Sequence, residues 1–413
     1  MPGNLRWLYA GRAVRSFAVA FLTVVFPLYL AAEGLHSAAI GTILALGGAG
    51  SAVLVAVIGL AGDRFGRRRM LLGLGVLGAL GGVTMALSGN PVAVTIASGL
   101  GGVGRGGGAG SGGSWGPVFP AEQPLLAAAA GPRERTAVFG RIAFVGVIAG
   151  AAGSLVAYLP DGLHASGWGW VPAYRVVFWL GALLCVVMVL VSLPLRETVP
   201  SAAPAAAAPE APRPVLSTAQ LIGRLSVTNG LNGLGIGFLG PLLTYWFHVR
   251  FGVGPGALGL LYTLVNLVTA LPYLGAARLA ARLGVVRAVV VTRAVTVLLL
   301  LAMTRMPTFT LAGIFFALRM AVNSLGMPSR QSYVMGVADE RRRGSVAALG
   351  MLPSQVTASL SPAIGGLLMQ AVLDTPLFGA ALFTGANCIS YYFAFRHLPP
   401  PEEIRPVGSK AAD

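Results

Sequence analysis

Charged residues are what this chain has least of. Asp, Glu, Lys and Arg make up 10% of its 413 residues, whereas about a quarter of a soluble domain is charged. The chain is 55% hydrophobic, with a mean hydropathy of +0.78, and long apolar runs recur from end to end. Such runs predict bilayer-spanning helices, because backbone polar groups must be satisfied internally in lipid. The shortage of charge excludes a soluble protein and predicts a lipid bilayer as the partner.

Cysteine and histidine are also scarce. The two cysteines, Cys185 and Cys388, each lie inside an apolar run, which argues against a disulfide framework and a thiolate metal site. The four histidines show no metal-ligand spacing, so no metal is expected. No nucleophilic triad and no ATP-binding motif are recognisable, which excludes an enzyme, a cofactor and a primary pump from the expectations.

Acidic residues number 13 against 29 Lys and Arg, a net charge of +16. The distribution of the basic residues along the chain decides how this positive excess is interpreted. To determine that distribution, the membrane spans must first be placed. Hydropathy predicts twelve spans, at residues 8–32, 38–61, 70–88, 92–129, 136–159, 172–194, 218–248, 256–280, 287–305, 308–337, 344–373 and 376–396. An even number of spans puts both termini on one side of the membrane.

The basic residues favour that side strongly when both termini are assigned to the cytoplasm. Three arginines fall in the loops on the opposite side, namely Arg175, Arg250 and Arg305. Four fall within spans, namely Arg105, Arg293, Arg319 and Arg330. The other Lys and Arg residues are counted with cytoplasmic segments. This bias predicts a multi-pass protein of the cytoplasmic membrane. The excess is therefore a topology signal and an attraction to anionic lipid, and no nucleic-acid partner is expected. The first apolar run is interpreted as an uncleaved helix, because its length exceeds that of a signal peptide.

The chain repeats itself in two halves joined by a Pro/Ala-rich linker. We expect a six-helix bundle at 1–194, a cytoplasmic linker at 195–217, a second bundle at 218–397 and a tail at 398–413. The segment GDRFGRRR at 62–69 matches AARLGVVR at 280–287, and PAEQ at 120–123 matches PSRQ at 328–331. A parallel duplication about an axis normal to the membrane follows, with a central cavity between the halves.

The loop after the second span, GLAGDRFGRRRM at 59–70, resembles the signature loop of the major facilitator superfamily. The five matching positions are Gly59, Asp63, Gly66, Arg67 and Arg68. The resemblance implies an all-α membrane protein with twelve transmembrane helices in two pseudo-symmetric six-helix bundles, which works as a monomer. It also implies that Asp63 latches the two halves on the cytoplasmic side when the cavity faces outward.

The same resemblance bears on the direction of transport. Arg105 is similar to the fourth-helix arginine of proton-coupled members, and with the signature loop it favours the drug-efflux-like branch. The fifth helix departs from the antiporter pattern, because Ala151 stands where that pattern has a proline. Export is therefore the favoured direction, and uptake stays open.

Glu122 is the one acid that falls clearly within a predicted span. Its equivalent in the second half, at an offset of 208 residues, is Arg330. Because repeat symmetry places equivalent faces opposite each other, we expect Glu122 and Arg330 to pair as a cytoplasmic-side gate. A buried carboxyl with changing partners is also a candidate proton site. A purely structural ion pair is the remaining alternative.

The remaining candidates are polar or aromatic residues expected to line the cavity. Arg319 and Asn323 share a face of the tenth helix, and Tyr262, Asn266 and Tyr273 recur at helical spacing on the eighth. The other expected cavity residues are Gln123, Gln331, Asn229, Asn232, Phe21 and Tyr29. Interhelical hydrogen bonding is the alternative for each asparagine.

The intramembrane charges indicate the kind of solute. Arg105, Arg319 and Arg330 against Glu122 leave a positive excess, which favours an anionic, zwitterionic or acidic amphiphilic solute over an organic cation. The sequence thus predicts a secondary active transporter that moves a small organic molecule by alternating access, coupled to protons and directed outward. The alternatives are proton-coupled uptake of an anionic metabolite and, in another class, a membrane sensor or scaffold that transports nothing.

Overall fold

A computed structural model of the chain describes the backbone of residues 2–101, 116–129, 135–196, 218–240, 242–270, 272, 282–337 and 343–396. Every regular element in these ranges is a helix. The first half comprises α1 (Pro2–Ala32), α2 (Ser37–Phe65), α3 (Arg67–Leu87), α4 (Pro91–Gly101), α5 (Val118–Ala129), α6 (Arg135–Ser154), the short 3₁₀ helix η1 (Leu155–Tyr158), α7 (Leu159–Ala165) and α8 (Trp170–Ser192). The second comprises α9 (Thr218–Leu239), α10 (Leu242–Phe251), α11 (Pro255–Ala270), α13 (Val285–Thr304), α14 (Phe309–Val337), α15 (Arg343–Leu368) and α16 (Thr375–Phe395).

These helices follow the predicted spans closely, and the predicted fold class is confirmed. The fourth span is represented by α4 and α5 on either side of residues outside the described ranges, and the seventh by α9 and α10, which meet near Gly240. The fifth continues from α6 through η1 into α7. Apolar runs rich in Leu, Val and Ala form helices because in lipid only local i to i−4 bonding satisfies their backbone.

Two glycines with a positive φ directly precede helices in corresponding places of the two halves. Gly66 alone separates α2 from α3 and has a φ of 91°, and Gly284 precedes α13 with a φ of 77°. A side chain at such φ values is strained, so only glycine fits easily. These are the two glycines that the sequence repeat aligned, and each comes just before a helix of its own half.

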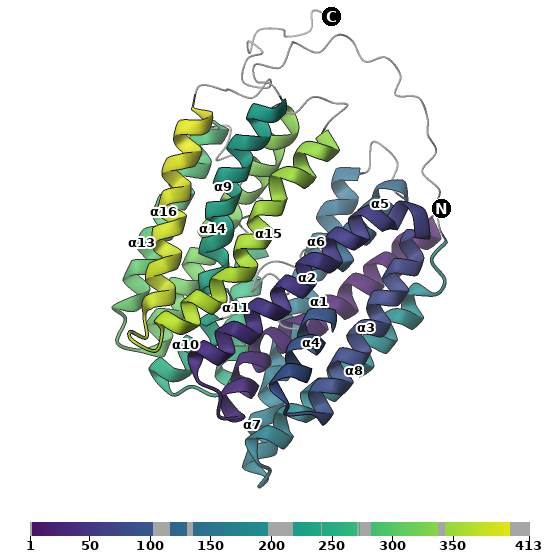
Figure 1. Cartoon of the computed structure of the whole chain (residues 1–413), viewed down its shortest axis with the longest axis vertical. Coiled ribbons are helices and arrows are strands. Elements are labelled where there is room, and N and C mark those ends of the chain that lie inside the picture. Colours follow the sequence, from purple (N-terminus) through teal and green to yellow (C-terminus); the bar gives the residue numbers. More distant parts are fainter. Residues whose placement is uncertain are drawn as a thin grey trace, which may run out of the picture.

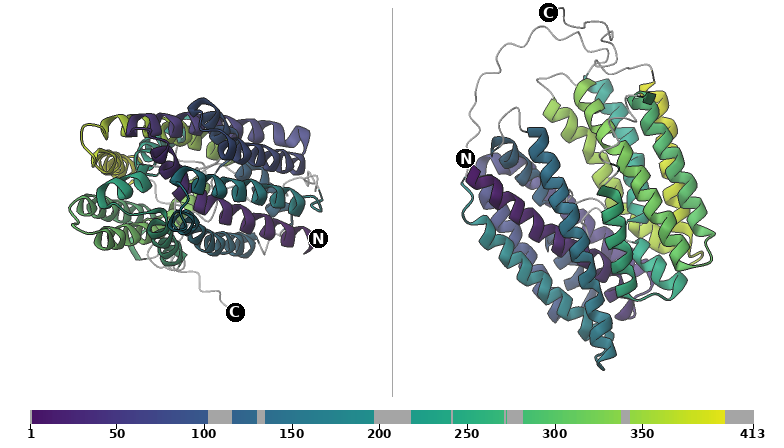
Figure 2. Two further views of the ribbon diagram at one scale, coloured as in Figure 1. Left: turned by 90° about the horizontal axis from the view of Figure 1, so that it is seen from below. Right: turned by 180° about the vertical axis from the view of Figure 1, so that it is seen from behind.

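The helices form two bundles that are tilted against each other. Figure 1 shows α1 to α8, purple to blue, in one bundle and α9 to α16, teal to yellow, in the other. We call the end where α1 begins and α16 ends the termini end, and the opposite end, where α7 and α10 lie, the far end. The right view in Figure 2, from behind, shows the bundles meeting near the far end and diverging toward the termini end, as in Figure 1.

Buried apolar side chains show the same difference between the two ends. One cluster joins both halves and includes Phe26 and Tyr29 of α1 with Trp246 of α10. At the termini end each half has a cluster of its own, one around Leu126 and the other around Phe395. The halves therefore share a core at the far end and are packed separately at the termini end.

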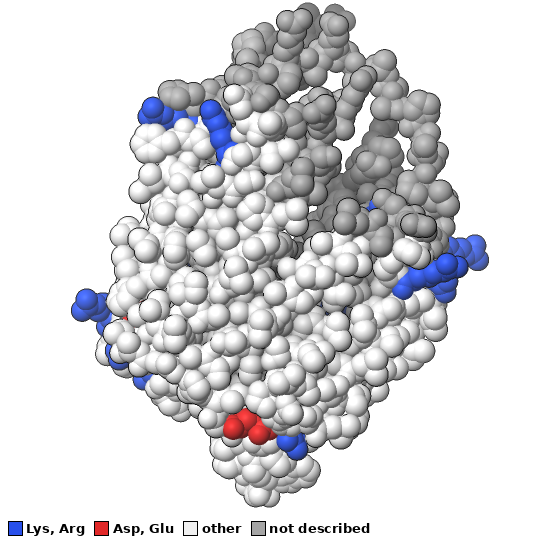
Figure 3. Space-filling view, viewed as in Figure 1, with Lys and Arg blue, Asp and Glu red and all other residues white. Residues whose placement is uncertain are grey.

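The outer surface is apolar enough for lipid. Among the described residues, seven helices are long and apolar enough to cross a membrane. On α8, large apolar side chains recur at helical spacing and are about half exposed, namely Trp179, Leu183, Val186 and Leu190. Figure 3 shows the charged side chains near the edges of the molecule, with a broad uncharged face between them. Such a face is stable against hydrocarbon and unstable against water.

Candidate functional site

The interface between the halves is closest at the far end. A Cβ added to Gly41 of α2 would meet the carbonyl oxygen of Pro362 and come within 2.9 Å of Cα of Gly366, both on α15. On the other side of the molecule, the hydroxyl of Thr263 on α11 donates to the carbonyl of Ala151 on α6 at 2.9 Å. Small residues thus let the backbones of the two halves touch.

A carboxylate also crosses this interface. Oδ2 of Asp161 on α7 accepts the backbone N–H of Gly256, in the first turn of α11, at 2.8 Å. The first N–H groups of a helix lack intrahelical partners and carry partial positive charge. Asp161 therefore caps a helix of the other half and joins the two halves at the far end.

Near the termini end, Glu122 of α5 lies between two arginines of α1. Arg12 Nε donates to Glu122 Oε1 at 3.1 Å, and its Nη2 lies 2.8 Å from Oε2. Arg15 Nη2 donates to the same Oε2 at 2.8 Å. All three side chains are buried. The first bundle therefore contains a buried charge cluster, Arg12–Glu122–Arg15, that ties α1 to α5.

This cluster corrects one sequence assignment. Arg12 and Arg15 were counted with cytoplasmic segments, but both are buried in the interior of α1. Counting by proximity to the N-terminus ignored that they stand three residues apart, which places them on one helix face. That spacing, together with an acid in a nearby span, was the available signal.

Several predicted site residues lie outside what the structure describes. Arg105 and Tyr273 are outside the described backbone, and the side chains of Asp63, Arg330 and Gln331 are outside the described side chains. The pairing of Glu122 with Arg330 and the latch at Asp63 therefore stay predictions. Of the signature loop, Gly59 lies within α2, Gly66 makes the turn and Arg67 begins α3. Arg68 donates to the carbonyl of Leu193 at the end of α8 at 2.6 Å.

In the second half, Arg319 is the eleventh residue of α14 and lies beside residues of two other helices. It is about 15 Å along the helix from Phe309, near the centre of a bilayer about 30 Å thick. Its guanidinium lies near the Tyr262 phenol of α11, whose oxygen lies 2.9 Å from the hydroxyl of Thr244 on α10. Within the described residues, Arg319 has no carboxylate within ion-pair distance, and its Nε is buried without a hydrogen-bond partner.

The predicted polar residues of α9 and α11 are buried between helices. Asn229 donates to the carbonyl of Gly350 on α15 at 2.7 Å, so interhelical bonding accounts for it. Asn232 is buried, and its Oδ1 has no hydrogen-bond partner in the described part of the chain. Asn266 is buried one turn beyond Tyr262, and Asn323 is partly exposed one turn beyond Arg319. Tyr262 and Asn266 thus share a face of α11, and Arg319 lies near Tyr262.

The aromatic candidates of α1 are packed inside the first half. Phe21 and Tyr29 are fully buried. The Tyr29 ring lies 4.9 Å from the ring of Phe178 on α8, and its hydroxyl donates to the carbonyl of Ser88 at 3.2 Å. Gln123 is half-buried next to Glu122 on α5. Sequence reasoning missed Thr244 and the Asp161 cap, because neither has a local pattern and both depend on which helices meet.

Two bundles of repeated helices, a lipid-facing exterior and charged groups inside define a membrane transporter. A family model, described as Major Facilitator Superfamily, matches residues 8–228 and 225–412. The chain belongs to the major facilitator superfamily, and it is a transporter, not an enzyme.

Solved structures with this fold have low sequence identity to the chain. A bacterial homologue of the human lysosomal transporter Spinster, in an inward-facing and occupied conformation, is 14% identical with a TM-score of 0.71, covering 95% of this chain and 96% of that one. A bacterial homologue of the iron transporter ferroportin, in an inward-facing state, is 12% identical with a TM-score of 0.71, covering 95% and 99%. The xylose transporter XylE from E. coli, in an inward-open conformation, is 12% identical with a TM-score of 0.68, covering 96% and 97%. No curated protein matches the chain.

Proposed function

We propose that this secondary transporter exports a small organic solute that carries an acidic group, driven by protons, across the cytoplasmic membrane. Both termini are then cytoplasmic, and the described state, with its closed far end, is open toward the cytoplasm. The observation that carries the proposal is Arg319, a guanidinium at mid-membrane depth with no carboxylate beside it among the described residues.

The cost of that position is the argument for a bound anion. A cation at the bilayer centre costs about 2.5–3.5 kcal/mol on insertion scales, and such residues pair with a partner or serve a pathway. The nearby phenol of Tyr262 and hydroxyl of Thr244 can share a hydrogen-bond network with the ligand, and they supply no negative charge. A carboxylate or phosphate of the solute completes the pair.

Glu122 supports the proton step and the gate. In the described state both of its oxygens are engaged by Arg12 and Arg15. Closure of the termini end would bring the second half toward α5, and Arg330 could then compete for the carboxylate. An exchange of partners would change the proton affinity of the carboxyl between the two states. In this way Glu122 serves both as part of the gate and as the proton site.

The proposal is tested with the purified protein in liposomes under an imposed pH gradient. Acidic, zwitterionic and cationic solutes of matched size are offered, and both solute and proton fluxes are recorded. We expect proton-driven movement of the acidic and zwitterionic solutes out of the compartment that the termini face. Movement of solute only toward that compartment would indicate uptake. If none of the offered solutes is transported, a membrane sensor is favoured.

Arg319→Gln tests the site itself. Hydrogen bonds to a charged group contribute about 1.5–3 kcal/mol, and 1.4 kcal/mol corresponds to about tenfold. We therefore expect transport of acidic solutes to fall at least about tenfold. The matched control is Arg305→Gln, because Arg305 is exposed at the end of α13, and it should leave transport unchanged. Equal effects of the two variants, or loss of cation transport alone, would contradict an anion site.

A further inference from the structure

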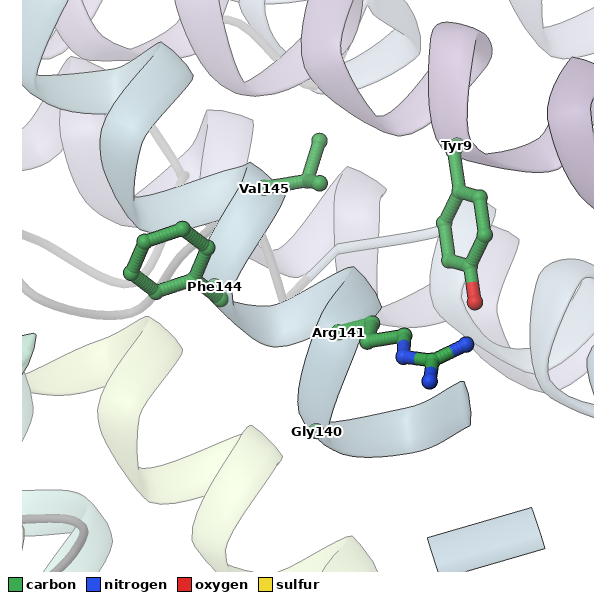
Figure 4. Close-up of a pocket in the computed structure, with 5 residues that line it drawn as sticks. All are labelled: Tyr9, Gly140, Arg141, Phe144 and Val145. Carbon is green, nitrogen blue, oxygen red and sulfur yellow. The ribbon is translucent and has the colours of Figure 1, made fainter. Parts of the chain in front are cut away.

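A pocket lies between α1 and α6 in the part of the first bundle nearer the termini end. It has a volume of about 540 Å³ and is lined by Tyr9 of α1 and by Gly140, Arg141, Phe144 and Val145 of α6. Figure 4 shows the phenol of Tyr9 and the guanidinium of Arg141 extending into the same space. Nearly all of the lining surface is apolar, and its polar atoms come from Tyr9 and Arg141.

The two polar groups of the pocket are both able to donate hydrogen bonds. The Tyr9 hydroxyl is buried and has no hydrogen-bond partner among the described residues. Leaving such a group unpaired costs about 1–3 kcal/mol. The Arg141 side chain is exposed, so its guanidinium is available to a ligand. A phenol beside a guanidinium offers two donors and a positive charge to one small anion.

The apolar side of the pocket suits a hydrocarbon chain. Phe144 is 60% exposed, and Val145 is next to it on the same helix. Arg141 stands about 9 Å along α6 from Arg135, the first residue of that helix, at 1.5 Å per residue. One turn further along α1, the Arg12–Glu122–Arg15 cluster contains two positive charges and one negative.

We infer that this pocket binds an amphiphile with an acidic head, such as a carboxylate or a phosphate monoester. The head accepts hydrogen bonds from Tyr9 and Arg141, and the tail lies against Phe144 and Val145. The inference deepens the proposed function, on which it rests, by naming the solute class and a second binding place. A solute bound in this pocket has its head near the termini end. It then moves to Arg319 and binds there at mid-membrane depth.

The test is photolabelling of the full-length protein in nanodiscs of zwitterionic lipid. The probe is a dodecanoic acid that carries a diazirine in its chain, and labelled peptides are mapped by mass spectrometry. We expect labels on α1 and α6 around the pocket, with labelling lowered about tenfold by Arg141→Gln and a few-fold by Tyr9→Phe. The matching dodecanol probe, which has no acid, should label these peptides weakly.

Arg6→Gln is the matched control, because Arg6 is exposed on α1 at the same end of the molecule. It should leave labelling unchanged. If Arg6→Gln lowers labelling as much as Arg141→Gln does, general surface charge explains the effect and the proposed binding in the pocket is wrong. Equal labelling by the acid and the alcohol would also overturn it. Melting temperatures of the variants should match the parent, since both arginines are exposed.

Two further arms identify the source of the acidic head. If phosphatidylglycerol in the nanodisc suppresses labelling, the bound molecule is a membrane lipid, whereas suppression by a transported acidic solute identifies the pocket as part of the transport route. Arg319→Gln should leave the labelling intact, because the central site is in the other half. Labelling needs no transport, so the pocket and the proposed function can fail separately.

Discussion

At the scale of single residues, Glu122 owes its place to two arginines one turn apart. Arg12 and Arg15 project from one face of α1 and meet the two oxygens of a single carboxylate on α5. Buried ion pairs contribute little net stability compared with apolar packing, but removing one partner is costly because a bare charge is left behind. The cluster therefore makes the position of α5 against α1 sensitive to any change at residue 122.

Glu122→Gln should destabilise the first bundle more than a change to either arginine. Removing the carboxylate leaves two buried guanidinium groups next to each other, and breaking a buried pair costs about 3–5 kcal/mol. Arg15→Gln should cost less, because Glu122 keeps its contacts with Arg12. The measurement is the apparent melting temperature of the purified variants in one detergent.

The control for this comparison is Glu33→Gln at the far end. Glu33 lies 3.4 Å from Arg175 and both side chains are partly exposed, so this pair should contribute about 0–1 kcal/mol. If Glu122→Gln melts no lower than Glu33→Gln, the cluster has no special part in holding α1 and α5 together.

Residue-level prediction from the sequence succeeded where a local rule applied. Gly66 and Gly284 were aligned by the repeat, and the positive φ of each follows from a one-residue turn. Glu122 was recognised as buried because an acid inside an apolar run is conspicuous. Its partners on α1 were missed, since hydropathy places residues in a span but says nothing about which helix they face.

At the scale of elements, the first turn of α11 is completed by the other half of the molecule. Asp161 on α7 accepts the N–H of Gly256, and a carboxylate near a helix N-terminus gains typically 0.3–1 kcal/mol, and up to about 2 kcal/mol when partly buried. Because donor and acceptor belong to different bundles, that free energy favours the state in which the far end is closed.

Asp161→Ala should shift the protein away from that state. A loss of about 1.4 kcal/mol changes a two-state ratio about tenfold. We expect double electron–electron resonance between spin labels at Ser166 and Val372, two exposed positions at the far end, to show a larger population of long distances. The native cysteines Cys185 and Cys388 are replaced first.

Asp374→Ala provides the matched comparison for the far-end aspartate. Asp374 also accepts a hydrogen bond at the far end, from Trp246 Nε1 at 2.8 Å, but both residues belong to the second half. It should leave the distance distribution between the halves unchanged. A shift of equal size in both variants would mean that the Asp161 contact does not bias the far end.

At the scale of the whole molecule, the distribution of buried apolar residues distinguishes the two ends. A shared cluster joins the halves at the far end, and separate clusters lie at the termini end. Opening the far end must therefore expose or repack apolar surface. Closing the termini end must instead bring together two hydrophobic clusters that are each already packed within their own half. The prolines inside α15, Pro353 and Pro362, are positions where a helix bends readily.

The sequence predicted the two bundles and could not predict their relative tilt. Hydropathy and the repeat define which residues are helical and which halves correspond, since both follow from local composition. Which end is closed depends on small free-energy differences between contacts such as Gly41 with Gly366 and Asp161 with Gly256. Those contacts join residues far apart in the chain and have no signature in it.

The coupling of protons to the transport cycle is tested by removing the carboxyl of Glu122 without adding charge to its surroundings. The double variant Glu122→Gln/Arg15→Gln keeps one net positive charge in the cluster, as in the parent, because one acid and one arginine are lost together. If Glu122 carries the proton, solute exchange without a gradient should persist, while a pH gradient should no longer drive accumulation. The measurement is solute uptake into liposomes with and without that gradient, in variants shown to be folded by their melting curves.

Arg15→Gln alone keeps the carboxyl and should keep the gradient drive. Full gradient drive in the double variant would exclude Glu122 as the proton site and leave it as the ion pair that holds α5 to α1.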